Sequence, residues 1–80
     1  MDTCWIQDFV TLAEVGNFTR AAEIRNVSQA AFSRRVQALE HWVGAKLIDR
    51  TAFPTRLTAA GERFRAVAVG LLSQIADAKA

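Results

Sequence analysis

Hydrophobic residues recur at helical spacing through most of this 80-residue chain. In the first such stretch, one face of a helix would carry Trp5, Ile6, Phe9, Val10 and Ala13. Gly16 follows this stretch, and glycine is common just past the C-terminus of a helix because it adopts the left-handed conformation without strain. The pattern therefore predicts a first helix that ends before Gly16.

A short second helix is predicted over the segment FTRAAEIR, residues 18–25. Asn17 precedes this segment, and its side-chain oxygen can accept a hydrogen bond from the free amides of the first helical turn. The residues expected to face the core are Phe18, Ala21 and Ala22. Asn26 then suits the tight turn that leads to a third helix, because asparagine tolerates the left-handed backbone conformation.

The third helix is predicted to run from about Gln29 to His41 or the next residue. Ser28 is placed to cap its first turn, and Gly44 to end it. At about 100° per residue its apolar side chains share one narrow arc, and they are Phe32, Val36, Leu39 and Val43. The opposite arc, the outer face, carries Ala30, Ser33, Arg34, Gln37 and His41. This outer face holds no acid, since Glu40 lies to one side of it.

After Gly44 the helical periodicity stops. Two short β-compatible segments, at about residues 47–50 and 56–58, flank a loop that contains Pro54 and predict a small β-hairpin, the wing. Thr58 is then expected to cap a last helix that continues to the end of the chain. Along this helix runs an apolar seam at heptad-like spacing, made of Phe64, Val67, Ala68, Leu71, Leu72, Ile75 and Ala78.

Together these elements predict a mainly α fold, a winged helix-turn-helix with a three-helix core and a β-hairpin wing, followed by a long C-terminal helix. We divide the chain into a winged helix-turn-helix domain at residues 1–58 and a final helix at residues 59–80. The major groove of B-DNA, about 12 Å wide, admits one α-helix, so the third helix is the natural candidate for a DNA-reading element.

Charge supports this interpretation through its distribution. The net charge is only +2, but residues 17–58 contain seven basic and three acidic residues, a local net charge of +4, and the flanks together carry −2. A basic middle between flanks that are together acidic fits a local nucleic-acid footprint. An ordinary solvated face remains an alternative at this point.

Several side chains on the outer face suit contact with DNA. Gln29 and Gln37 can pair with base edges, and Arg34 can reach a guanine or a phosphate. The small residues Ala30 and Ser33 let the helix backbone approach the bases closely. The third helix therefore offers both hydrogen-bonding groups and close access.

For the other arginines the sequence indicates the contact partner less clearly. Arg50 and Arg56 flank the proline-containing tip of the wing, which can lie along the neighbouring backbone or minor groove. Arg35 lies off the outer face, and we expect it to contact a phosphate. Arg25 can lay its aliphatic stem over the core and send its charge outward, so both a phosphate contact and plain solvation stay open for it.

Five blocks occur in order along the chain: FTRAA at residues 18–22, VSQAAFSRRV at 27–36, LE at 39–40, GAKLIDR at 44–50 and LTAAG at 57–61. From Phe9 to the final helix the sequence thereby resembles the N-terminal winged helix-turn-helix of LysR-type transcriptional regulators. The resemblance implies a third helix in the major groove, with contacts from Ser28, Gln29, Ala30, Ser33 and Arg34. It also implies phosphate contacts near Thr19 and Arg20 and wing contacts from Arg50, Thr51 and Pro54. The chain departs from the family's usual residues at Arg25, Ala30 and Ile48.

In the family that the sequence resembles, the last helix pairs with its counterpart in a second subunit. The resemblance therefore implies a linker and dimerisation helix whose contacts are Phe64, Val67, Ala68, Leu71, Leu72 and Ile75. The implied partners are double-stranded DNA and a second copy of the chain, with a tetramer possible in a full-length parent. Family members continue into an effector-sensing domain, whereas this sequence stops at Ala80.

Other functional classes find little support. Cys4 is the single cysteine, which excludes an internal disulfide and a zinc site of paired cysteines, and we interpret it as a small hydrophobe of the first helix. His41 shares a helix with both Ser28 and Ser33, an arrangement without a nucleophile–base geometry, so we expect neither an enzyme nor a cofactor. The longest apolar run, residues 66–72, is far shorter than the roughly 18 residues of a membrane span, and we expect a cytoplasmic protein.

A winged helix used for protein–protein contact is the alternative function. Such an interface would favour exposed aromatic residues, and the outer face of the third helix has none. Trp42, at the end of that helix, is expected to pack under the wing or against the final helix.

Overall fold

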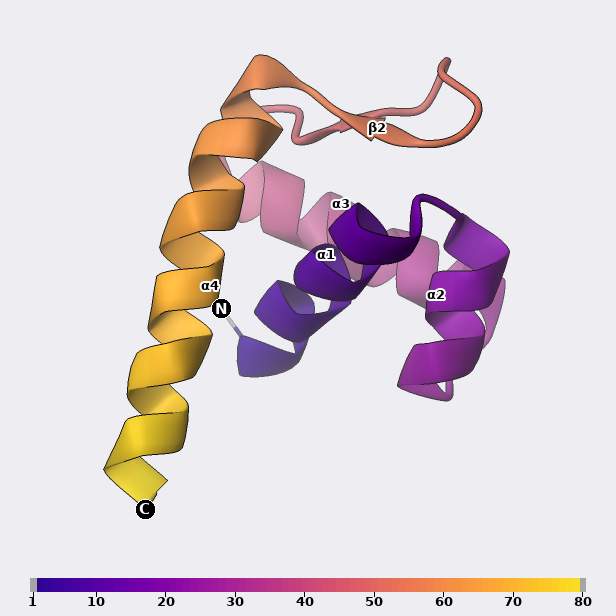
Figure 1. Ribbon diagram of the computed structural model, residues 1–80. Coiled ribbons are helices and arrows are strands. Elements are labelled where there is room, and N and C mark those ends of the chain that lie inside the picture. The colour runs from indigo at the N-terminus through magenta and orange to yellow at the C-terminus, as the bar shows by residue number, and fades with distance from the viewer. Residues whose placement is uncertain (1, 80) are drawn as a thin grey trace.

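Three short helices, one long helix and a two-stranded hairpin make up the computed structural model, which describes residues 2–79. The helices are α1 (Thr3–Val15), α2 (Phe18–Arg25), α3 (Gln29–Val43) and α4 (Ala59–Lys79), and the strands are β1 (Ile48–Asp49) and β2 (Arg56–Leu57). Figure 1 shows α1 between α4 and α2, with α3 crossing behind it and the hairpin extending over the top. The predicted fold, a winged helix-turn-helix followed by a long helix, is confirmed.

Local hydrogen bonds and turns mark both termini of the short helices where the sequence predicts. The side-chain oxygen of Asn17 accepts from the amide three residues ahead at 3.0 Å, and Ser28 Oγ does the same at 3.1 Å. The chain turns left-handed after each helix, at Gly16 (φ 65°), Asn26 (φ 64°) and Gly44 (φ 86°). These groups satisfy amides and carbonyls that a helix end leaves free. Only the end of α3 differs slightly, because its last residue is Val43.

Each helix contributes to one hydrophobic core. Its buried apolar side chains are Ile6, Phe9, Leu12, Ala21, Ala22, Phe32, Val36, Leu39, Leu47, Ile48 and Ala68. Aromatic rings meet edge to face at two places, Phe9 with Phe64 at 5.5 Å and Phe18 with Phe32 at 6.0 Å between centroids. Full burial of such a side chain stabilises a fold by about 1.5–3 kcal/mol, so the core fixes the position of α3 through its apolar face.

The hairpin is attached closely to the start of α4. Its antiparallel register pairs Ile48 with Leu57 and Asp49 with Arg56, and each strand has two residues, fewer than the sequence predicts. Thr58 Oγ1 accepts from the amide of Gly61 at 3.0 Å, which confirms the predicted cap. A Cβ on Gly61 would collide with the carbonyl oxygen of Leu47, so this glycine lets α4 pass directly against the wing.

The helix α4 packs against the core only as far as Leu72. Phe64 and Leu72 lie against the core and Ala68 is fully buried in it, whereas the later turns extend away from the domain (Figure 1). Val67, Leu71 and Ile75 are 55%, 37% and 38% exposed. The apolar seam therefore divides into residues that pack on the core and residues that stay exposed. The dimer contact predicted for Ala68 is corrected, because its side chain is buried within its own chain.

Candidate nucleic-acid interface

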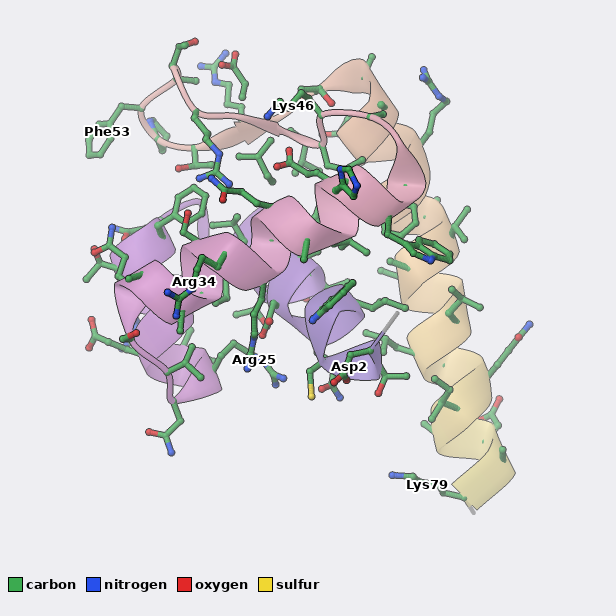
Figure 2. All side chains as sticks on the ribbon, turned by 180° about the vertical axis from the view of Figure 1, so that it is seen from behind. Asp2, Arg25, Arg34, Lys46, Phe53 and Lys79 are labelled. Atoms are coloured by element: carbon green, nitrogen blue, oxygen red, sulfur yellow. The ribbon has the colours of Figure 1, made fainter. Side chains whose placement is uncertain are left out.

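The outer face of α3 is open to solvent along its length. Ala30, Arg34, Gln37 and His41 are exposed and Ser33 is half-buried. Figure 2 shows Arg34 on the outward side of α3, away from the core. Glu40 does not present its side chain on this face, because only 4% of the residue is exposed. A helix backed by the core and polar on its open side is the arrangement that a DNA groove requires.

At the N-terminus of α3, a hydrogen bond joins the two helices of the helix-turn-helix. Thr19 Oγ1 donates to Gln29 Oε1 at 3.0 Å. This hydrogen bond uses one of the two lone pairs of the Gln29 amide oxygen and leaves the NH₂ group able to donate to a ligand. Ser28 Oγ accepts from the amide of Ala31, so its hydroxyl hydrogen likewise remains available as a donor. Both side chains are exposed, as is Arg20.

Arg50 links the wing to both helices. Its Nη1 donates to Ser33 Oγ at 3.2 Å, and its guanidinium carbon lies 4.7 Å from the centre of the Phe18 ring. Its Nη2 is 3.7 Å from Glu40 Oε1. Arginine stacks well on aromatic faces, and this position adds a positive charge beside the N-terminal half of α3.

A cavity of about 350 Å³ opens between the wing and the N-terminal ends of α2 and α3. Its lining residues are Asn17, Phe18, Thr19, Gln29, Ser33, Arg50, Ala52, Phe53 and Thr55. The fold thus brings together residues from three segments that the sequence predicts as DNA contacts, among them Thr19, Gln29 and Arg50. Phe53 is one of the lining residues that sequence reasoning did not single out as a DNA contact.

The remaining predicted wing residues lie at the hairpin. Thr51 donates to Asp49 Oδ1 from its hydroxyl at 2.6 Å and from its amide at 3.0 Å. These two hydrogen bonds, the hydroxyl first, hold the pKa of Asp49 below its ordinary value. Pro54 is exposed in the loop between the strands, and Arg56 is exposed on β2 opposite Asp49. Asp49 is therefore hydrogen-bonded within the loop, while Arg56 is exposed to solvent.

Arg35 and Arg25 do not lie where the sequence reasoning put them. Arg35 donates to Asp8 from Nε at 2.6 Å and from Nη2 at 2.7 Å, and Arg25 Nε donates to the same carboxylate at 2.8 Å. Asp8 is fully buried, so these bonds tie α1, α2 and α3 together. The hydrogen bonds that Arg35 donates to the Asp8 carboxylate also raise the pKa of Arg35. The predicted phosphate contact of Arg35 is corrected to an ion pair within the chain, and Arg25 has the same partner.

Glu40 is a second buried acid that sequence reasoning passed over. Its Oε2 accepts from the amides of Leu47 and Ile48 at 2.8 and 3.2 Å, so it holds the start of the wing against α3. One signal was present in the sequence, because at about 100° per residue Glu40 borders the apolar arc of α3. Asp8, by the same measure, lies about 60° outside the apolar face predicted for the first helix, so helical periodicity did not signal its burial.

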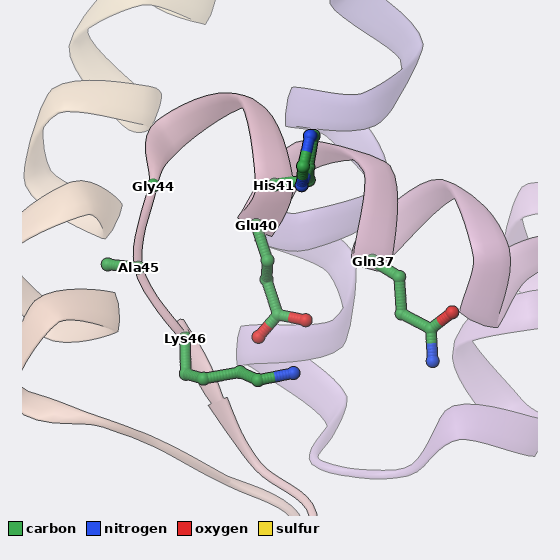
Figure 3. A pocket seen from close by; sticks show the side chains of 6 residues that line it. All are labelled: Gln37, Glu40, His41, Gly44, Ala45 and Lys46. Carbon is green, nitrogen blue, oxygen red and sulfur yellow. The ribbon is translucent and has the colours of Figure 1, made fainter.

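A second hollow, of about 700 Å³, lies at the C-terminal end of α3. Figure 3 shows its lining residues, which are Gln37, Glu40, His41, Gly44, Ala45 and Lys46. It is open and adjoins the outer face, so it widens the candidate interface toward Lys46. Within residues 2–79, no group of three or more His, Cys, Asp or Glu side chains is placed to hold a metal ion.

Two further expectations concern single residues. Trp42 is expected from the sequence to pack under the wing or against the final helix. This expectation is corrected, because 58% of Trp42 is exposed to solvent. Cys4 is half-buried in α1, where the sequence placed it. No helix within the described part of the chain is long and apolar enough to cross a membrane.

The geometry of α3 and its wing agrees with known proteins. A family model described as bacterial regulatory helix-turn-helix protein, lysR family, matches residues 5–62. The chain belongs to this family. The HTH-type transcriptional regulator YjiE of Escherichia coli strain K12 is 44% identical to this LysR-family chain over 75 residues, a match that covers 94% of the chain and 25% of YjiE. The chain spans about a quarter of the length of such curated relatives.

The structure of this LysR-family chain is similar to solved structures of proteins in complex with DNA. DarR of Vibrio fischeri, solved in complex with DNA, superposes with a TM-score of 0.96 at 49% identity, covering 98% of this chain and 27% of DarR. The BenM DBD in complex with catB site 1 DNA gives a TM-score of 0.92 at 32% identity and covers 96% of this chain and 83% of the BenM chain. The relatives named here are thus transcriptional regulators or parts of them.

Proposed function

We propose that this chain is the DNA-binding domain of a LysR-type transcriptional regulator and that it binds a specific duplex sequence. The proposal rests chiefly on the outer face of α3, which is exposed, free of acid and supplied with Arg34 and Gln37. DarR and the BenM DBD, which share the fold, have been solved with DNA. In this proposal α3 lies in the major groove and the wing, residues 47–58, lies on the adjacent backbone or in the minor groove.

Individual roles follow from the groups left free. Gln29 donates from its NH₂ group to a base edge or a phosphate while its oxygen accepts from Thr19. The Arg34 guanidinium makes no hydrogen bond with another of residues 2–79, so it can bind a guanine through two donors. Arg20, Arg56 and the first amides of α3 are placed for phosphates, which position the protein without reading sequence.

A selected duplex tests the proposal directly. A site is first isolated with the wild-type chain from a library of random duplexes, and affinities for that site and a scrambled one are then compared at physiological salt. We expect Arg34→Ala to lose roughly tenfold or more on the selected site, since a bidentate base contact contributes about 1–3 kcal/mol. Lys79→Ala is the matched control, because it removes one charge at the far end of α4 (Figure 2).

Two outcomes would revise this proposal. Equal affinity of the wild type for selected and scrambled duplexes would remove the claim of specificity. A uniform loss across all sequences in Arg34→Ala, together with a shallower salt dependence, would reassign Arg34 from a base contact to a phosphate contact.

We also propose that the chain forms a homodimer through α4, as a linker and dimerisation helix at residues 59–80 beside the domain at 1–58. Val67, Leu71 and Ile75 carry this proposal, because they remain exposed along α4. Sedimentation of Leu71→Asp should yield monomers, while Val69→Asp, about 200° away around the helix, should not. A wild type that stays monomeric at high concentration would refute it. A two-fold dimer would bind half-sites about one helical turn, or a multiple, apart.

The setting of this activity follows from the relatives. We place it in the cytoplasm, where bacterial DNA is read, and we assign no catalytic step and no cofactor to these residues. A tetramer and the sensing of an effector belong, in this proposal, to a longer parent protein, in the part that relatives such as YjiE have and this chain does not cover.

A further inference from the structure

The wing ends in an apolar side chain that no contact within the chain explains. Phe53 is 96% exposed, against 58% for Trp42, the next most exposed of the large hydrophobic residues. Leaving such a ring in water forgoes the favourable free energy that its burial would contribute. Single exposed hydrophobic residues are common on proteins, so the exposure of Phe53 gains meaning only from its position.

Phe53 lies on the rim of the proposed DNA interface. It lines the cavity of about 350 Å³ whose other walls include Thr19 on α2, Gln29 on α3 and Arg50 at the start of the wing loop. Figure 2 shows Phe53 projecting from the outer end of the wing loop, beyond the end of α3 that carries Arg34. Anything that fills the space between the wing and the N-termini of α2 and α3 therefore meets the Phe53 ring.

The surroundings of Phe53 favour a polyanion. Arg50 and Arg56 are exposed on the wing. The one acid of the wing, Asp49, precedes Arg50 and pairs with Arg56 across the hairpin, and it is held by Thr51. A flat apolar ring among positive charges suits base pairs that lie between two phosphate backbones. Pro54 follows directly and restricts the backbone at this point, which limits the freedom that the tip would lose on binding.

We propose that Phe53 is an apolar wedge that inserts from the minor groove at one base step beside the site read by α3. This rests on the proposed function, because α3 must first dock in the major groove. The ring partly unstacks the step and bends the duplex away from the wing. Specificity then arises at a position without base hydrogen bonds, and pyrimidine–purine steps are favoured there because they unstack most easily.

The test uses a duplex selected with the wild-type chain, with 2-aminopurine placed at one flanking position at a time. We expect the wild type to raise 2-aminopurine fluorescence at a single step and to shorten the end-to-end distance measured by energy transfer. Phe53→Ala should abolish the fluorescence rise, straighten the duplex and weaken binding roughly tenfold, the loss expected for one stacked aromatic ring. Phe53→Leu, which keeps an apolar wedge, should retain most of the bend.

Controls separate this inference from the proposed function. Ile24→Ala removes an apolar side chain that is 50% exposed on α2, and it should leave fluorescence and bend unchanged. Urea unfolding should give the same midpoint for wild type and Phe53→Ala, because the ring packs on nothing. If the wild type binds no duplex selectively, the proposed function itself fails. If it binds selectively and Phe53→Ala keeps the fluorescence rise and the bend, or loses only affinity, the wedge is overturned while DNA binding stands.

Discussion

Asp8 and Glu40, the buried acidic side chains among residues 2–79, hold two different regions of the molecule. Both oxygens of Asp8 accept from arginine side chains, which ties the three short helices to one another. One oxygen of Glu40 accepts from two wing amides, while the other has only Arg50, at 3.7 Å.

The difference shows how the two regions are secured. The helices have their own core and caps, and Asp8 adds an ionic bond at their common edge. The strands of the wing have two residues each, so they contribute few hydrogen bonds of their own. The wing therefore depends on Glu40, a residue of α3, and the proposed recognition helix positions its own wing.

Removing Arg35, one of the two arginines that bind Asp8, should give the largest loss of stability. Arg35→Ala leaves one oxygen of a fully buried carboxylate without its partner, and we expect the free energy of unfolding to fall by about 3 kcal/mol. Urea unfolding followed by circular dichroism measures this. The neighbouring Arg34→Ala, on the exposed outer face, should change stability by less than about 0.5 kcal/mol. Equal stability of the two variants would contradict the structural role given to Asp8.

A smaller and more local effect is expected at Glu40. Glu40→Gln keeps the volume and a neutral acceptor but loses the charge that strengthens the bonds to Leu47 and Ile48, a loss of about 1–2 kcal/mol. Hydrogen exchange should show these two amides opening faster, with little change in α1. Uniformly faster exchange in every helix would mean that Glu40 supports the whole domain and not the wing in particular.

Arg50 should contribute least among these side chains to the stability of the free protein. It is exposed, and its separation from Glu40 exceeds a hydrogen bond, so Arg50→Ala should cost about 1 kcal/mol or less. A double-mutant cycle with Glu40→Gln measures their coupling, which we expect to be below about 0.5 kcal/mol. A coupling well above this value would make Arg50 a second anchor of the wing.

The smallest effect concerns acid pH and the wing turn. The hydroxyl and amide of Thr51 lower the pKa of Asp49 on folding, so its stabilising contribution is complete above the ordinary value of 3.8 and is lost as pH falls through the lower folded value. NMR titration of the Asp49 carboxyl should show Thr51→Val moving this pKa back toward 3.8. An unchanged pKa would assign the shift to the backbone amide alone.

The candidate site was predictable wherever one segment supplies all the information. The outer face of α3 follows from helical spacing, and its exposed residues Ala30, Arg34 and Gln37 are those that the sequence indicates. Arg35 and Phe53 were not predictable in this way. A side chain on the flank of a helix turns to DNA or to an acid depending on which acid is near, and Asp8 lies 27 residues away in sequence.

The sequence by itself determined the helices, their caps and the inner face of each, because these depend on hydrogen bonds between residues three or four apart and on the repeat of apolar side chains. Only the tertiary structure decided the partners of the charges. Asp8 and Glu40 are buried because arginines and amides from distant segments converge on them. Likewise, where α4 leaves the core is set by the extent of α1 against which it packs, which no periodic pattern within α4 encodes.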